Sequence, residues 1–166
     1  MKILVPVDGS ALSLEAVRHV LGLVRNGLKA QIVLANVQEP ASLYEIVIAR
    51  DPAVLEDVST GAGTYLLQEA RALCQGAGVA HETAVVSGDP ANALIDIVEQ
   101  YGCSAIVIGA HGKGALASAL QGSVSLAVVH ASPVPVTLVK QAMDDQPAAA
   151  WGGPAATDRD DQAPAR

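Results

Sequence analysis

The chain has 166 residues, of which 51 % are hydrophobic and 2 % are aromatic, and it contains no Phe. A core of this composition is built from aliphatic side chains, which favours one domain of parallel strands covered by helices over an all-β sandwich. The formal net charge of −7 argues against nucleic acid and anionic membrane surfaces as partners, because both attract clustered Lys and Arg.

Two further features narrow the class of protein. Cys74 and Cys103 are the only cysteines, and neither has a CxxC neighbour or a nearby pair of histidines, so we expect no zinc site and no redox dithiol. The first ten residues already have the pattern of a strand and a turn, not of a basic leader followed by an apolar signal region. Since no apolar run reaches membrane-spanning length, we expect a cytoplasmic protein.

Strand-like segments alternate with helical patterns along the chain, which predicts right-handed βαβ crossovers and a parallel sheet. We expect strands at residues 2–7, 31–37, 81–86, 105–108 and 134–140.

Three helices are predicted between these strands. Apolar residues at helical spacing place the first over residues 10–25, with Ser10 as its N-cap. The second is expected over about residues 60–76. The third begins after Asp89-Pro90, where Asp89 caps the helix and Pro90 takes its first position.

Two segments do not fit this alternation. Residues 39–58 form an extra connection of open secondary structure, which either packs on the surface or forms part of a wall over a ligand. Residues 141–166 are rich in Ala, Pro and Asp and have no periodic apolar face, which predicts a disordered tail after a domain spanning residues 1–140.

The most informative motif is Gly109-x2-Gly112-x9-Gly122-Ser123, which directly follows the apolar run of residues 105–108. A buried parallel strand ends at the sheet edge where ligands bind in open α/β folds. Glycine lets main-chain N–H groups approach a polyanion, and Gly122-Ser123 opens a helical pattern whose first N–H groups carry partial positive charge. This spacing predicts a loop that binds phosphates through its backbone.

Three segments, MKILVPVDGS, VVSGDPANALIDIVEQ and IVIGAHGKGALASALQGSVS, resemble the universal stress protein family, and the resemblance extends over residues 1–140. It implies an α/β fold with a single doubly wound domain, a five-stranded parallel sheet in the order 3-2-1-4-5 and helices on both faces. The intact glycine motif resembles the subgroup that binds ATP, with Mg²⁺ as the accompanying ion. The resemblance also implies a homodimer formed through the edge strand at residues 134–139.

The same resemblance implies which residues contact the nucleotide. Phosphates and ribose would be held, largely by main-chain N–H groups, at Gly109, Gly112, Gly122, Ser123, Val124 and Ser125. Asp8 would lie near the adenine or ribose, the backbone of Val37 would contact adenine, and His111 and Lys113 could approach phosphate oxygens.

Some of these residues have a second interpretation. Asp8-Gly9-Ser10 is also a good turn and helix start, although Asp8 follows the first strand at the switch point where doubly wound sheets bind ligands. Val37 could equally pack in the core, and His111 and Lys113 could be solvent-facing loop residues.

The sequence favours nucleotide binding over turnover. No G-x4-GK[ST] motif occurs, and no Ser or Thr follows Lys113 to hold magnesium. Phosphoryl transfer needs a positioned base, a metal and extra positive charge, whereas the loop offers mostly backbone N–H groups. We assign no catalytic residue, and slow hydrolysis or self-phosphorylation on Ser123 or Ser125 is the minor alternative.

We therefore expect an ATP-binding stress-response or signalling module that acts through nucleotide-dependent conformation or partner binding. The alternative is a dimeric scaffold that recruits protein partners while its crevice stays empty. Its protein partners are not identified by the sequence.

Overall fold

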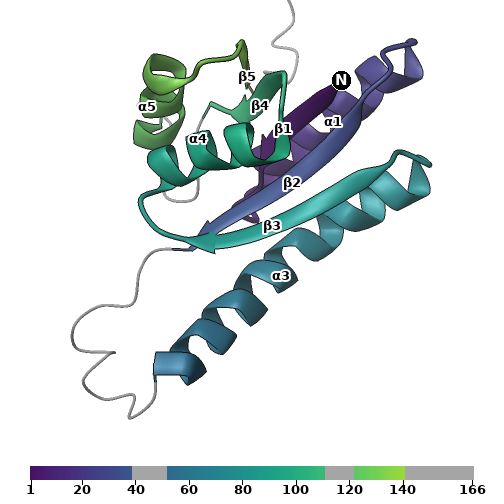
Figure 1. Cartoon of the computed structure of the whole chain (residues 1–166). Coiled ribbons are helices and arrows are strands. Elements are labelled where there is room, and N and C mark those ends of the chain that lie inside the picture. Colours follow the sequence, from purple (N-terminus) through teal and green to yellow (C-terminus); the bar gives the residue numbers. More distant parts are fainter. Residues whose placement is uncertain (39–51, 111–121, 141–166) are drawn as a thin grey trace, which may run out of the picture.

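The computed structural model of the chain describes residues 1–38, 52–110 and 122–140, and for residues 52–59 it describes the backbone alone. Strands and helices alternate through these residues (Figure 1). Their order is β1 (Lys2–Pro6), α1 (Ala11–Arg25), β2 (Gln31–Gln38), α3 (Pro52–Gly76), β3 (His81–Ser87), α4 (Pro90–Tyr101), β4 (Ala105–Gly109), α5 (Ser123–Ala131) and β5 (Val136–Val139).

The described strands form one five-stranded parallel sheet in the order β3-β2-β1-β4-β5. This confirms the predicted topology. The central strand β1 pairs with β2 on one side, with Ile3 opposite Ile32, and with β4 on the other, with Ile3 opposite Ala105. The chain therefore adds β2 and β3 on one side of β1 and then β4 and β5 on the other side.

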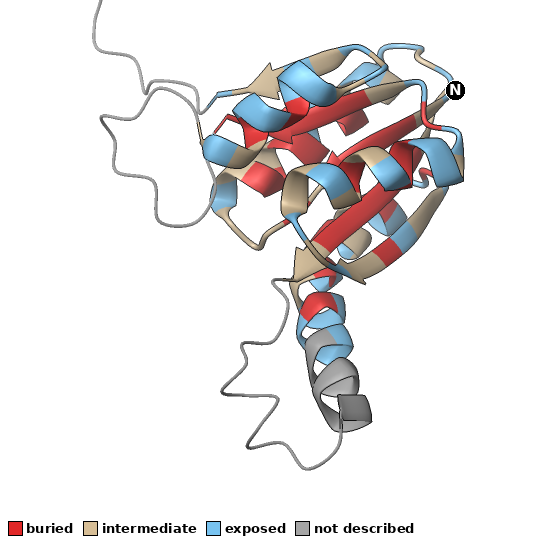
Figure 2. Ribbon diagram, turned by 60° about the vertical axis from the view of Figure 1, so that its left-hand side comes forward, coloured by how far each residue is buried: buried red, intermediate tan, exposed pale blue. Residues whose placement is uncertain are grey.

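Helices cover both faces of the sheet because alternate residues of each strand point to opposite sides. On one face, Val5 and Leu34 pack with Val17 of α1 and Leu67 of α3. On the other face, side chains of the intervening positions pack with α4 and α5, among them Leu4, Val33, Leu94 and Val128. The strands form the buried layer between helices whose outer faces are exposed (Figure 2), which confirms the doubly wound arrangement.

Two predicted helix starts have the expected caps. The Ser10 hydroxyl accepts a hydrogen bond from the backbone N–H of Ser13 at 3.1 Å, and an Asp89 carboxylate oxygen accepts one from Asn92 at 3.0 Å. Pro90 stands at the start of α4, where its missing N–H leaves no donor unpaired. These local signals place the first turns of α1 and α4 at the sheet edge that follows β1 and β3.

The second helix was predicted too short. It begins at Pro52, not at about residue 60, because Pro is favoured in a first helical turn and the helix continues through Gly61 and Gly63. Gly63 is buried, so packing against the sheet accommodates a residue that is unfavourable in helix interiors.

The last strand was predicted too long. It covers Val136–Val139, not residues 134–140. The Ser132 hydroxyl accepts from the Val134 N–H and donates to the Val134 carbonyl, so the backbone of Val134 is engaged in a local turn. Pro135 has no N–H to contribute to a ladder. No described helix combines the length and the apolar character needed to cross a bilayer.

Candidate functional site

The candidate site lies at the carboxyl ends of β1 and β4, which are neighbours in the sheet. Leu4 of β1 is opposite Ile106 of β4, so the residues that follow both strands reach the same edge. From β1 the chain continues to β2 on one side, and from β4 it continues to β5 on the other. This is the topological switch point at which open α/β sheets bind ligands.

Gly109, the last residue of β4, lies against the first turn of α1. A Cβ at this position would lie 3.1 Å from the Leu12 side chain and 3.3 Å from Leu12 backbone atoms. The absence of a side chain therefore lets α1 approach the end of β4. The predicted role of Gly109 in phosphate binding stays a prediction. The close contact with Leu12 explains the glycine at this position whether or not a phosphate binds.

The segments before and after residues 111–121 are tied together at Ala110. Its backbone N–H donates to Val139 of β5 at 2.8 Å, and its carbonyl accepts from the Gly122 N–H at 2.7 Å. The start of α5 is thereby fixed next to the end of β4. His111, Gly112 and Lys113, which the sequence assigns to the phosphate loop, lie outside the described residues.

Helix α5 begins at this edge with Gly122 as its N-cap, and no side chain caps it. Ser123 is exposed and Val124 is half-buried, with its side chain packed against the α4 and α5 core. The first-turn N–H groups of a helix have no partner within the helix and carry partial positive charge. They can therefore donate hydrogen bonds to an anion at the sheet edge.

Ser125 differs from Ser123 in burial and in contacts. It is 3 % exposed, and its hydroxyl lies 3.0 Å from the Ala110 carbonyl and 2.9 Å from the Gly122 carbonyl. Its single O–H is shared between these two backbone oxygens and so joins α5 to the end of β4. In this arrangement its side chain supports the backbone of the site, and its predicted contact with nucleotide is not tested.

The turn after β1 has the structure expected of Asp8-Gly9-Ser10 as a helix start. An Asp8 carboxylate oxygen accepts from the Ser10 N–H at 2.9 Å, and Gly9 has a φ of 77°, which favours glycine. Asp8 is half-buried at the switch point, so its turn-forming role is compatible with the predicted contact to adenine or ribose.

Val37 lies near the end of β2. It pairs with Val86 of β3, and its side chain packs against the α4 and α5 core. Val37 therefore has the core-packing role that the sequence allowed as an alternative. Its predicted backbone contact with adenine stays a prediction.

The sequence interpretation missed Asn36, a polar residue inside the apolar run of β2. Its side-chain N–H donates to the Val7 carbonyl at 2.7 Å. A single Asn within an otherwise aliphatic strand is the signal that could have identified it, since a buried amide needs partners.

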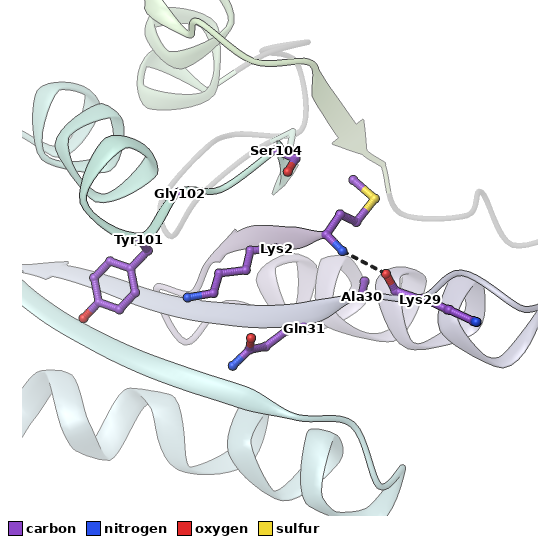
Figure 3. Close-up of a pocket in the computed structure, with 8 residues that line it drawn as sticks. Lys2, Lys29, Ala30, Gln31, Tyr101, Gly102 and Ser104 are labelled. Atoms are coloured by element: carbon purple, nitrogen blue, oxygen red, sulfur yellow. Dashed lines mark hydrogen bonds between the residues drawn. The ribbon is translucent and has the colours of Figure 1, made fainter.

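A concave region lies at the opposite edge of the sheet, where the strands begin. It is a hollow of about 560 Å³, lined by Met1, Lys2, Lys29, Ala30, Gln31, Tyr101, Gly102 and Ser104. The Lys2 side chain is directed toward Tyr101, and that of Lys29 points the other way (Figure 3). Because Lys2 also forms an ion pair with Glu82 at 2.9 Å, these cations do not converge on one point.

The described residues contain no group of three His, Cys, Asp or Glu side chains arranged to hold a metal ion. Cys74 and Cys103 are both buried. Burial raises the pKa of the Cys74 thiol to about 11 and also raises the pKa of Cys103, so both thiols stay protonated at neutral pH.

The sheet order and the reversal of strand order beside β1 define a doubly wound α/β protein with a topological switch point. The profile of the universal stress protein family matches residues 1–140. The chain therefore belongs to the universal stress protein family, whose members are stress-response proteins.

Individual relatives agree with this assignment. Universal stress protein MJ0531 of Methanocaldococcus jannaschii is 27 % identical over 140 residues, which are 84 % of this chain and 82 % of the relative. The solved structure of the hypothetical protein MJ0577 is 27 % identical and superimposes with a TM-score of 0.73, covering 84 % of this chain and 95 % of that one. A universal stress protein in complex with cAMP is 26 % identical, with a TM-score of 0.59 and coverages of 84 % and 95 %.

Proposed function

We propose that this universal stress protein binds ATP, with Mg²⁺ as the accompanying ion, at the sheet edge between β1 and β4. The observation that carries the proposal is the start of α5, which lies at the switch point with an exposed Ser123 and no capping side chain on Gly122. The related structure in complex with cAMP supports an adenine nucleotide as the ligand class.

In this proposal the backbone does most of the binding. The N–H groups of Ser123 and Val124 donate to phosphate oxygens, and the positive end of the α5 dipole stabilises their negative charge. Asp8 lies on the other side of the crevice, after β1, where its carboxylate can accept hydrogen bonds from ribose hydroxyls. Phosphoryl transfer also needs a positioned base and extra positive charge, whereas binding here rests mainly on backbone N–H groups, so in this proposal the nucleotide acts as a signal that changes conformation or partner choice.

The test is calorimetric titration of the purified protein with ATP and Mg²⁺. Gly122 has φ −67° and ψ 148°, an extended conformation that Val also adopts. Gly122→Val therefore places a branched side chain over the first turn of α5 without requiring backbone strain. We expect this variant to bind ATP at least about tenfold more weakly, a loss of about 1.4 kcal/mol.

The matched control is Gly76→Val at the other end of the molecule, where α3 ends and no heavy atom lies within 4 Å of an added Cβ. It should keep the native affinity. Absence of binding by the native protein, or equal binding by Gly122→Val, would contradict the proposal. Protein that is also free of nucleotide when isolated gently would then favour the dimeric scaffold.

A further inference from the structure

Asn36 is a buried amide in the strand that neighbours β1. It is 2 % exposed and lies on the sheet face covered by α1 and α3, close to the end of β2. A buried amide costs free energy unless its donor and acceptor groups find partners. The partners of Asn36 therefore indicate its role.

Each end of the amide is held. The side-chain N–H group donates to the Val7 carbonyl at 2.7 Å, and the side-chain oxygen accepts a hydrogen bond from the Gln38 amide. Helix α3 closes over it, because a Cβ added to Gly63 would lie 2.8 Å from the Asn36 oxygen. Asn36 thus has one defined orientation, with its donor directed at β1.

The contact with Val7 lies where β1 leaves the sheet. The paired register of β1 and β2 ends with Pro6 opposite Ala35, and the Val7 N–H donates to the Ala35 carbonyl at 2.7 Å. Beyond that bond, a side chain from β2 holds the Val7 carbonyl.

The next residues form the turn into α1. Asp8 accepts from the Ser10 N–H at 2.9 Å, and Ser10 caps the helix. The first turn of α1 in turn lies against Gly109 at the end of β4. The Asn36 contact is therefore one residue away from Asp8, at the start of the turn that enters the switch point.

We propose that Asn36 is a positioning residue whose side-chain amide fixes the exit of β1 and thereby the orientation of the Asp8–Ser10 turn toward a nucleotide. The contact with nucleotide rests on the proposed function. Asn36 holds the turn in the absence of a ligand, so the positioning of the turn and the contact with nucleotide can be tested separately.

Asn36→Asp is the most informative variant because it changes the donor with almost no change in shape. The carboxylate cannot donate, and its oxygen faces the Val7 carbonyl oxygen. When the carboxyl is protonated its O–H can donate to that carbonyl, and such a bond to the neutral form raises the pKa above the ordinary value of about 3.9. Lowering the pH should therefore restore the native turn in this variant.

Two readouts are measured over the same pH range. In the protein without nucleotide, the backbone amide resonances of Gly9 and Ser10 should be displaced in Asn36→Asp at neutral pH and return toward their native positions in acid. ATP affinity by calorimetry should be about tenfold weaker at neutral pH, as expected for one lost buried hydrogen bond, and should recover in parallel. Asn36→Ala should show the loss without the recovery.

Controls are needed for the added charge and for effects of pH elsewhere in the protein. Asn26→Asp makes the same chemical change at the exposed C-cap of α1 and should leave both readouts native. The native protein and Asn36→Ala, measured over the same pH range, give the baseline for every effect of pH that does not come from residue 36. If Asn36→Asp does not fold, Gln38→Met removes the partner that orients the amide and should displace the same resonances by a smaller amount.

The proposal is overturned if folded Asn36→Asp, or Gln38→Met in its place, keeps the native resonances of Gly9 and Ser10. Displaced resonances with native ATP affinity would overturn the link to the nucleotide. If the native protein binds no ATP while the resonances follow the expected pH dependence, the proposed function fails and the positioning of the turn stands.

Discussion

Ser123 and Ser125 are two residues apart, yet the structure gives their hydroxyl groups different surroundings. The Ser125 hydroxyl is buried against the carbonyls of Ala110 and Gly122, whereas Ser123 is exposed. The sequence motif assigns both to the nucleotide because spacing alone does not show which side of a helix faces the core. Ser123 and Ser125 therefore differ in burial, and we expect their substitutions to differ in their effects on stability and on nucleotide binding.

Ser125→Ala should lower the free energy of unfolding by about 0.5–1.5 kcal/mol, the typical net value of one intramolecular hydrogen bond. Ser123→Ala should change it by less than about 0.5 kcal/mol, as exposed substitutions usually do. Urea denaturation of both variants measures the difference. A loss for Ser125→Ala no larger than that for Ser123→Ala would contradict a stabilising contact of the Ser125 hydroxyl between α5 and β4.

For Gly109 the sequence predicts the position in the fold but not the packing contact. The motif predicts its position at the end of a buried strand, and the structure confirms that position. Its contact with Leu12 joins segments almost a hundred positions apart in the chain, so no local pattern could reveal it. Asn36 did have a local signal, a single Asn in an aliphatic strand, but its partner Val7 follows the neighbouring strand β1, so the sequence does not show their contact.

At the scale of elements, helix α3 depends on a close contact at Gly63. A Cβ there would lie 2.5 Å from the Val85 side chain and 2.8 Å from the Asn36 oxygen. Gly61, on the same helix, has no heavy atom within 4 Å of an added Cβ. The two glycines therefore provide a matched pair.

Gly63→Ala should destabilise the protein by about 1–3 kcal/mol, because added volume in a packed core forces its surroundings to shift. Gly61→Ala should stabilise it by up to about 1 kcal/mol, because Ala is the better helix former. Thermal or urea unfolding of both variants distinguishes them. Equal stabilisation by the two substitutions would contradict the close packing of α3 on the sheet.

The same contrast explains which element boundaries could be predicted. The starts of α1 and α4 follow from Ser10 and Asp89, whose side chains cap the helices locally. The start of α3 does have a local signal in Pro52, but Gly61 and Gly63 are unfavourable in a helix interior and obscure the helical pattern after it. The ends of β5 have no such signal. The helix tolerates Gly63 through tertiary packing, and the strand is shortened by the local turn at Ser132.

At the scale of the whole molecule, the alternation of strands and helices predicted a parallel sheet, and the resemblance to a family supplied its order. Both are confirmed. The strand order could not be derived from periodicity. Each βαβ unit has a fixed, right-handed crossover, but this does not determine on which side of the sheet the next strand is added. The location of the site depends on that order, since only a reversal beside β1 creates the switch point.

We propose that two copies of the chain associate through the edge strand at residues 134–139. Strand β5 is the last in the sheet, and an edge strand presents unpaired backbone groups that can pair with a second chain. Light scattering of the native protein should therefore give twice the mass of one chain at micromolar concentration. Thr137 is exposed, and Thr137→Lys should shift the protein toward monomers because charge on an edge opposes pairing.

A native protein that scatters as a monomer would contradict this interface. A dimer that Thr137→Lys does not weaken would place the contact elsewhere. Glu99→Lys is a suitable control, since it adds a lysine at an exposed position of α4 and should leave the mass unchanged.

The hydrogen bond between Ala110 and Gly122 also bears on how this family can diversify. Because the two residues meet at 2.7 Å, the eleven positions between them (residues 111–121) begin and end at one anchored point of the scaffold. Doubling the length of such an insert adds only about 0.6 kcal/mol of closure entropy. Mutation can thus lengthen or rewrite that stretch while the supporting architecture is inherited unchanged.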